Sequence, residues 1–162
     1  MIITVASGKG GTGKTTLAVN LAHALACGEE TDDVRLLDCD VEEPDDHLFV
    51  KPHFTEREEV TALRPEWDEK ACTACGRCRE ACNYNAVALV PLKDGGKKVK
   101  VFPDLCHACG ACSYICPENA LNDRPEAIGT VKADPASGRY YFAHGTLNVG
   151  EMMAPAVVKG VR

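Results

Sequence analysis

The sequence has no long apolar run, no basic leader segment and no extended cluster of positive charge. Its uncharged apolar stretches fall well short of the roughly 20 residues that a membrane helix needs, so we expect no membrane span. Residues 1–5 lack the basic and apolar regions of a secretory signal peptide, which makes the cytoplasm the expected compartment. The formal net charge of -6 repels phosphates, so no nucleic-acid partner is expected.

Against these absences stand ten cysteines among 162 residues. Cysteines spaced closely in a chain of the reducing cytoplasm indicate metal ligands rather than disulfides. The surrounding sequence repeats with an offset of 34 residues, so residues 61–125 look like two copies of one unit. Eight of the cysteines form two runs of identical spacing, Cys72-x2-Cys75-x2-Cys78-x3-Cys82 and Cys106-x2-Cys109-x2-Cys112-x3-Cys116.

Two kinds of metal centre would use eight thiolates in two sets of four. Structural zinc takes four thiolates per ion, whereas a [4Fe–4S] cluster takes one at each iron corner. Three cysteines with two residues between each and the next can wrap a tight loop around three corners of a cluster. Gly76 and Gly110 give that loop its backbone freedom. The repeated spacing therefore favours two [4Fe–4S] clusters. Outside the runs, Cys27 and Cys39 are expected to be small buried apolar residues, and His107 an exposed loop residue.

The cysteine runs resemble those of bacterial two-cluster ferredoxins, in which the fourth cysteine of each run ligates the other cluster. The second run keeps the proline that usually follows, Pro117, whereas the first has Asn83. This resemblance implies one cluster on Cys72, Cys75, Cys78 and Cys116, and another on Cys106, Cys109, Cys112 and Cys82.

A second motif lies at the N-terminus. An apolar segment, residues 2–5, is expected to form a strand, and a helix is expected over 14–27. The loop between this strand and this helix matches the phosphate-binding pattern G-x-x-x-x-G-K-[ST] in full and consists of Gly8, Lys9, Gly10, Gly11, Thr12, Gly13, Lys14, Thr15 and Thr16. In such a loop, backbone N–H groups cradle phosphates, Lys14 reaches the β- and γ-phosphates, and the Thr15 hydroxyl binds Mg²⁺.

An acidic segment follows the next expected strand, residues 34–38. This strand should complete a right-handed parallel βαβ unit, which brings Asp38-Cys39-Asp40 to the edge that holds the phosphate loop. One carboxylate would hold Mg²⁺ through water, and the other would orient the attacking water.

The early lysine in K-G-G-T-G-K-T-T resembles the deviant Walker A motif of the MinD/ParA class of P-loop ATPases. The resemblance implies that Lys9 crosses a homodimer interface to the partner's nucleotide, that Asp40 activates water and that Asp38 belongs to the Mg²⁺ shell. The segment from Asp38 to Phe49 looks like the acidic stretch that follows this motif in one branch of that class. In that branch a two-cluster ferredoxin is inserted into the ATPase domain.

The expected fold is therefore α/β, an incomplete P-loop parallel sheet with an inserted α+β ferredoxin-like domain. The expected domains are a nucleotide-binding part at 1–60, the ferredoxin-like insert at 61–125 and a return at 126–162. In the return we expect strands at 128–132 and 140–144, a turn at 134–138 and a short helix near 153–160. No apolar strand ending in Asp follows residue 150, so the chain is expected to stop before the Walker B strand.

Two functions fit this pattern. The first is a nucleotide-dependent iron–sulfur protein that couples Mg·ATP to electron transfer or to delivery of a cluster to an acceptor protein. The second is a ferredoxin-like electron carrier whose nucleotide site is vestigial or non-hydrolysing. Retention of Lys9, Lys14, Thr15 and both aspartates favours the first. The family resemblance implies ATP hydrolysis. Because the sequence has no Walker B strand, we do not expect this chain to hydrolyse ATP alone.

Overall fold

The computed structural model of the chain describes residues 1–28, 33–93, 95–137 and 139–162. They form two compact units, each described by itself below. The first comprises Met1–Val60, Gly129–Asn148 and Ala154–Arg162, and the second comprises Thr61–Ile128 and Val149–Met153. The long strands β2 (Glu56–Trp67) and β5 (Leu121–Ser137) contribute residues to both units.

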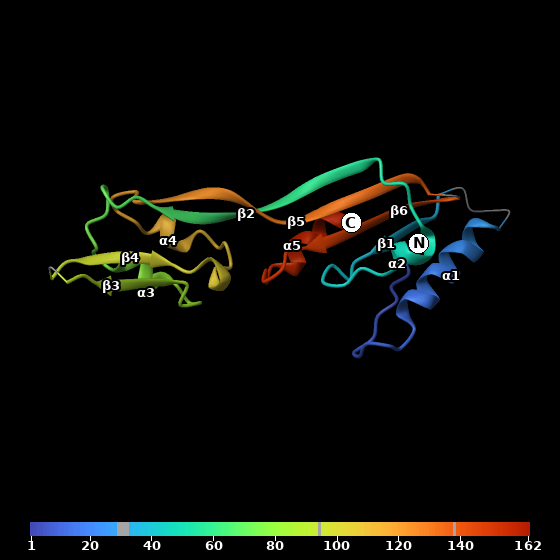
Figure 1. Cartoon of the computed structure of the whole chain (residues 1–162), viewed down its shortest axis with the longest axis horizontal. Helices are drawn as coiled ribbons and strands as arrows, with labels where there is room; N and C mark the ends of the chain where they lie inside the picture. Colours follow the sequence, from blue (N-terminus) through green and yellow to red (C-terminus); the bar gives the residue numbers. More distant parts are fainter. Residues whose placement is uncertain (29–32, 94, 138) are drawn as a thin grey trace. The chain divides into compact units, whose positions relative to one another are not determined.

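The first unit is built on a mixed sheet with the strand order β1-β6-β5-β2. Strand β1 (Arg35–Asp38) runs parallel to β6 (Tyr140–Leu147), and this pairing sets Asp38 directly beside His144. Strand β6 pairs with β5 in an antiparallel hairpin (Figure 1). The unit is therefore a mixed α/β structure whose sheet contains a parallel pair, as a P-loop nucleotide-binding fold requires.

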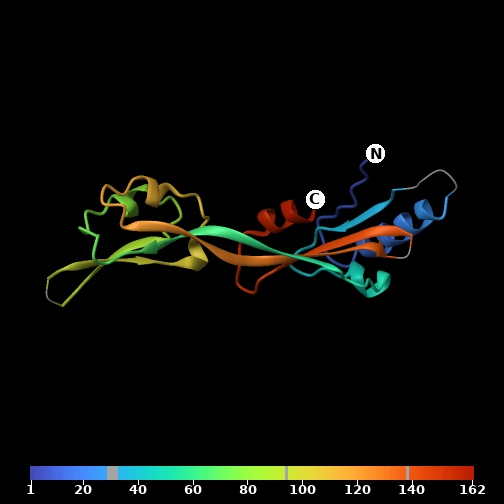
Figure 2. The same cartoon turned by 90° about the horizontal axis from the view of Figure 1, so that it is seen from above.

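Helices cover both faces of this sheet. Helix α1 (Lys14–Ala26) buries Ala22 against Leu36 and Phe142 on one face. Helix α5 (Ala154–Val161) lies on the other face (Figure 2). Successive β6 residues point to opposite sides, so Phe142 faces α1 whereas Gly145 faces α5. A Cβ at Gly145 would lie 2.8 Å from a Val157 methyl carbon, so the close approach of α5 needs glycine there.

The second unit holds the cysteine-rich repeat. Strands β3 (Val87–Pro91) and β4 (Lys97–Val101) form an antiparallel hairpin, followed by the 3-10 helix η1 (Pro103–Leu105). The short helices α3 (Arg77–Ala81) and α4 (Ala111–Tyr114) lie against each other. The buried core of this unit consists of Cys78, Val87, Val99, Cys112 and Leu121.

The strand expected at residues 2–5 does not form. Met1 and Ile2 are fully or largely exposed, and in the described part of the chain this segment pairs with no strand. A strand needs a hydrogen-bonding neighbour as well as apolar side chains, and the parallel neighbour of β1 is β6. The expected βαβ unit is therefore wrong in this respect.

Helix α1 forms as expected and ends one residue early. The face that packs on the sheet is not the apolar face expected from the sequence, which consists of Leu17, Leu21, Ala24 and Leu25. Ala18, Val19 and Ala22 face the core, whereas Leu17 is 58% exposed. The apolar pattern of this helix is nearly uniform, so the sheet that it packs on decides which side is buried.

The expected hairpin and C-terminal helix are confirmed, with longer strands than the sequence indicated. Strand β5 continues to Ser137 across a register shift near Asp134, so most of the expected turn at 134–138 is strand; residue 138 lies outside the described residues. Cys27 and Cys39 are exposed, which corrects the expectation that both are buried. Cys39 follows Asp38 at the end of β1, and alternation along the strand turns it away from the buried side.

Over the residues that the structure covers, every helix is too short or too polar to cross a membrane.

Candidate functional site

Four cysteines line a cavity of about 340 Å³ in the second unit. Three of them, Cys72, Cys75 and Cys78, come from the first run, and the fourth, Cys116, comes from the second. Trp67, at the end of β2, lines the same cavity. We call this space cavity one.

A second cavity, of about 350 Å³, has the complementary lining. Cys106, Cys109 and Cys112 come from the second run, and Cys82 from the first. We call this space cavity two. The structure thus gathers all eight run cysteines in two groups, each with three members of one run and the last member of the other.

The repeated backbone geometry explains why the two groups are alike. Gly76 and Gly110 both have positive φ, 89° and 72°, and each directly precedes a short helix, α3 or α4. That region of φ favours glycine, so these turns depend on the glycine in each copy. The turn puts Cys78 and Cys112 on the first turn of their helices, where both are buried.

Backbone N–H groups point at three of the sulfurs. Ala74 donates to Cys72 at 3.4 Å, and the fourth cysteine of each run receives a bond from the alanine four residues later. These distances are 3.3 Å from Ala86 to Cys82 and 3.2 Å from Ala120 to Cys116. Donors aimed at sulfur stabilise thiolate over thiol.

Burial acts in the opposite direction on two of the thiols. It raises the pKa of Cys78 and of Cys112 above the ordinary thiol value. The neighbours that raise the pKa of Cys78 further are Cys72 and Cys116, which places one cysteine of the second run close to two of the first. Without a positively charged group in the cavity these sulfurs stay protonated, and metal binding would release those protons.

The spacing of the thiols does not suit a single ion. In residues 1–28, 33–93, 95–137 and 139–162, no three His, Cys, Asp or Glu side chains are arranged to hold one metal ion. Four thiolates on one zinc, each about 2.3 Å from it, would lie within about 4 Å of one another. The described thiols are not gathered as closely as the ligands of one ion would be.

The phosphate-loop residues form an exposed turn at the start of α1 in the first unit. Gly11 and Gly13 have φ of 73° and 85°, and a Cβ on either would meet no atom within 4 Å. The loop is held from within, since Thr12 donates a 2.7 Å hydrogen bond to Ser7. Its concave side is therefore open at a helix N-terminus, where N–H groups and the helix dipole favour an anion.

Two buried carboxylates lie beside this loop. Asp38 accepts hydrogen bonds from the backbone N–H groups of Asp40 and Asp46, at 3.0 and 3.1 Å. The Thr15 hydroxyl lies near the Asp46 carboxylate and acts to lower its pKa. Burial, as the largest cause, raises the pKa of both carboxylates, that of Asp46 to about 6. Asp38 also contributes to the raised pKa of Asp46, and the nearby Asp40 and Asp45 act in the same direction on both carboxylates. Asp38 and Thr15 are thus brought together through Asp46, while Asp40 is exposed.

Sequence reasoning missed Asp46. The acidic stretch was visible, but which of its carboxylates turns inward depends on α2 (Asp46–Val50), which begins at that residue. It also missed His144, whose side chain is buried between Phe54, 4.7 Å away by ring centroids, and His47, 5.3 Å away. Burial first, and then the nearby His47 and Lys132, lower the pKa of His144 to about 4. No sequence pattern predicts the burial of this histidine, because its position depends on the pairing of β6 with β1, which sets it beside Asp38.

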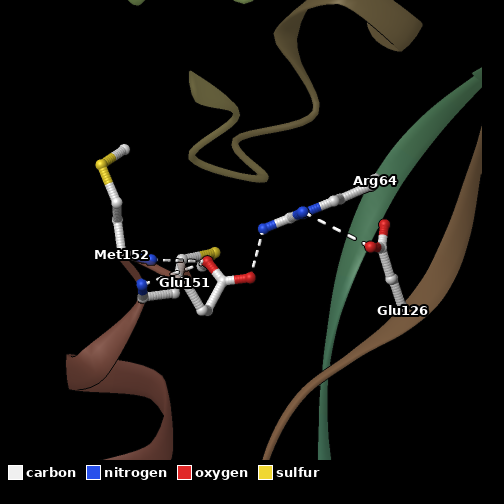
Figure 3. A network of polar contacts seen from close by, with 5 residues as sticks. Arg64, Glu126, Glu151 and Met152 are labelled. Carbon is white, nitrogen blue, oxygen red and sulfur yellow. Dashed lines mark hydrogen bonds and ion pairs between the residues drawn. The ribbon is translucent and has the colours of Figure 1, made fainter. Parts of the chain in front are cut away.

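A buried arginine ties three segments of the second unit together (Figure 3). Arg64 on β2 forms ion pairs with Glu151 and, at 3.5 Å, with Glu126 on β5. Glu151 also accepts hydrogen bonds from the backbone N–H groups of Met152 and Met153, at 2.9 and 3.3 Å. The loop that precedes α5 is thereby fixed to β2.

Three curated relatives share parts of this sequence. The chain is 60% identical over 43 residues to the iron-sulfur cluster transfer protein NUBPL of Mus musculus, which is 26% of the chain and 14% of that protein. It is 31% identical over 163 residues to the uncharacterised protein MJ0579 of Methanocaldococcus jannaschii, covering 98% of the chain and 54% of that protein. It is 30% identical over 87 residues to the protein MJ0578 of the same organism, covering 54% of the chain and 30% of that protein.

The chain thus spans at most about half the length of these relatives. The family model described as the CobQ/CobB/MinD/ParA nucleotide binding domain matches residues 3–154, nearly the whole sequence. Together with the loop at the start of α1 and the mixed sheet below it, this match shows that the chain belongs to the CobQ/CobB/MinD/ParA nucleotide-binding family.

Proposed function

We propose that the chain is a nucleotide-dependent iron–sulfur protein, which binds Mg·ATP at the loop of residues 8–16 and one [4Fe–4S] cluster in each cavity. The observation that carries the proposal is the lining of the cavities, four cysteines each, with the fourth always supplied by the other run. Residues 61–125 are, on this proposal, a ferredoxin-like insert in the nucleotide-binding domain.

The residues around each cavity fit such a cluster. Cys72, Cys75, Cys78 and Cys116 would hold one, and Cys106, Cys109, Cys112 and Cys82 the other. The backbone donors of Ala74, Ala86 and Ala120 would keep their hydrogen bonds to ligand sulfur, which offsets part of the negative charge of the thiolates. When bound, a [4Fe–4S] cluster accepts and releases single electrons.

The loop in the first unit supplies the groups that bind a nucleoside triphosphate. Its N–H groups would cradle the phosphates, Lys14 would contact the β- and γ-phosphates, and the Thr15 hydroxyl would enter the Mg²⁺ shell. Asp38 would hold Mg²⁺ through water, and Asp46, which already contacts Thr15, would position that hydroxyl. Lys9 would reach the nucleotide of a second copy in a homodimer, and Asp40, which is exposed, would turn toward the attacking water.

The output that we propose is transfer of electrons or of a cluster to an acceptor protein, driven by nucleotide binding. The similarity to a cluster transfer protein over 43 residues supports the second form of output. A ferredoxin-like carrier with a non-hydrolysing nucleotide site is the alternative. It is favoured by one observation, the absence of a strand at residues 2–5 leading into the loop within the described chain.

Anaerobic reconstitution with iron and sulfide tests the cluster assignment. We expect about eight irons and eight sulfides per chain, with the broad visible absorption and the EPR signal of reduced [4Fe–4S] clusters. Zinc supplied in competition should not displace the iron, because the cavities do not suit a single ion. A chain that retains about two zinc ions and no sulfide would contradict the proposal.

A further inference from the structure

Trp67 is the only tryptophan of the chain and the last residue of β2. Its ring packs against the core of the second unit, which contains Cys78 and Leu121. Its indole Nε1 is buried, and no hydrogen-bond acceptor for it exists among the residues that the structure covers. A buried N–H group is almost always paired, so an isolated one indicates a partner that the chain does not supply.

The place of Trp67 identifies that partner by its chemistry. The residue lines cavity one together with Cys72, Cys75, Cys78 and Cys116. An acceptor in that cavity must have exposed lone pairs and negative charge to compensate an indole donor in a dry, sulfur-lined space. The sulfide and thiolate sulfurs of an iron–sulfur cluster have both properties.

We propose that the Trp67 Nε1–H donates a hydrogen bond to a sulfur of the cluster in cavity one, and thereby raises the reduction potential of that cluster. This inference rests on the proposed function. Reduction adds one electron to the cluster and leaves the proton on Nε1, so no bond to hydrogen forms or breaks. The donor stabilises the more negative, reduced state more than the oxidised one, which makes reduction easier.

Cavity two has no buried indole donor in its lining. Its lining has no tryptophan; Tyr84 and His107 lie there instead, with their rings stacked at 3.8 Å between centroids. Both residues are exposed to solvent, Tyr84 to 44%. The two halves of the cysteine repeat are therefore unequal, and we expect the cluster in cavity one to be reduced first.

A redox titration of the iron-loaded chain, with dithionite as the one-electron reductant and EPR as the readout, tests the proposal. Trp67→Phe keeps the ring but removes the donor. We expect it to make reduction of one cluster about tenfold less favourable, a shift of about 59 mV to lower potential, and to leave the other cluster unchanged. Tyr84→Phe is the matched control in cavity two, and it should leave the cluster in cavity one unchanged.

A second measurement needs no substitution at Trp67. The wild-type chain is labelled with indole-¹⁵N tryptophan, and pulsed EPR of the reduced protein then reports any ¹⁵N nucleus coupled to a cluster. We expect one coupling, because there is one tryptophan. Full iron content without that coupling, or potentials unchanged in Trp67→Phe, would overturn this inference alone. A wild-type chain that takes up no iron would overturn the proposed function and this inference with it.

Discussion

Cys116 lines the same cavity as Cys78, although the two belong to different cysteine runs. The reciprocal relationship places Cys82 among the cysteines of the second run. Two local sequence motifs are therefore joined into two sites, and neither site is complete without a residue from the other half of the repeat.

This exchange predicts different results for two matched cysteine substitutions. Cys116→Ala should damage the cluster in cavity one and Cys82→Ala that in cavity two, each lowering the iron content from about eight toward about four per chain. The fluorescence of Trp67 tells them apart, since iron next to the indole quenches its emission. We expect quenching to be lost in Cys116→Ala and retained in Cys82→Ala; the reverse pattern would mean that the ligands do not cross.

Two buried groups in the first unit should give its stability opposite dependences on pH. The pKa of His144 is about 4 in the folded chain against an ordinary 6.5, so the unfolded chain binds the extra proton and stability is lost as the pH falls through that range. The pKa of Asp46 is about 6 against an ordinary 3.8, so here the folded chain holds the extra proton and stability is lost as the pH rises.

Thermal melts of two variants between about pH 4 and pH 7 separate these contributions. His144→Phe should gain in melting temperature relative to the wild type as the pH falls, because a neutral ring replaces a group that resists protonation. Asp46→Asn should gain relative to the wild type as the pH rises. If the melting-temperature difference from the wild type changed in the same direction with pH for both variants, one of these side chains would not be buried as the structure has it.

The Arg64 network predicts unequal costs for its two carboxylates. Glu151 is buried, with a side chain 9% exposed, so Glu151→Ala leaves the Arg64 charge without its main partner and should cost about 3 kcal/mol. Glu126 is 53% exposed, and Glu126→Ala should cost less than about 1 kcal/mol. Urea unfolding followed by Trp67 fluorescence reports on this unit. Equal costs would contradict the account of the network.

The parts of the molecule that the sequence predicted are those with local patterns. The cysteine spacing marked the repeat, and the glycines before α3 and α4 marked its turns, because positive φ at Gly76 and Gly110 is a local requirement. The apolar segments predicted helix α1 and the β5–β6 hairpin, although not the face of α1 that is buried. The family match over residues 3–154 agrees with the phosphate-loop motif.

What the sequence could not predict depends on contacts between distant residues. The apolar segment at 2–5 has the composition of a strand but no neighbour to pair with in the described chain. Asp46 becomes important only because α2 turns it toward Thr15, and His144 only because β6 lies beside β1. No sequence pattern distinguishes Trp67, and its importance comes from the cavity that it lines.

Mg·ATP binding to the anaerobically purified, cluster-loaded chain tests the central claim most directly, with Lys14→Ala as the control. The account predicts that the wild-type chain binds Mg·ATP, and that Lys14→Ala abolishes binding while its iron and sulfide content stays at the wild-type level. A cluster-loaded wild-type chain with no affinity for Mg·ATP would contradict the account and leave the ferredoxin-like carrier as the better description.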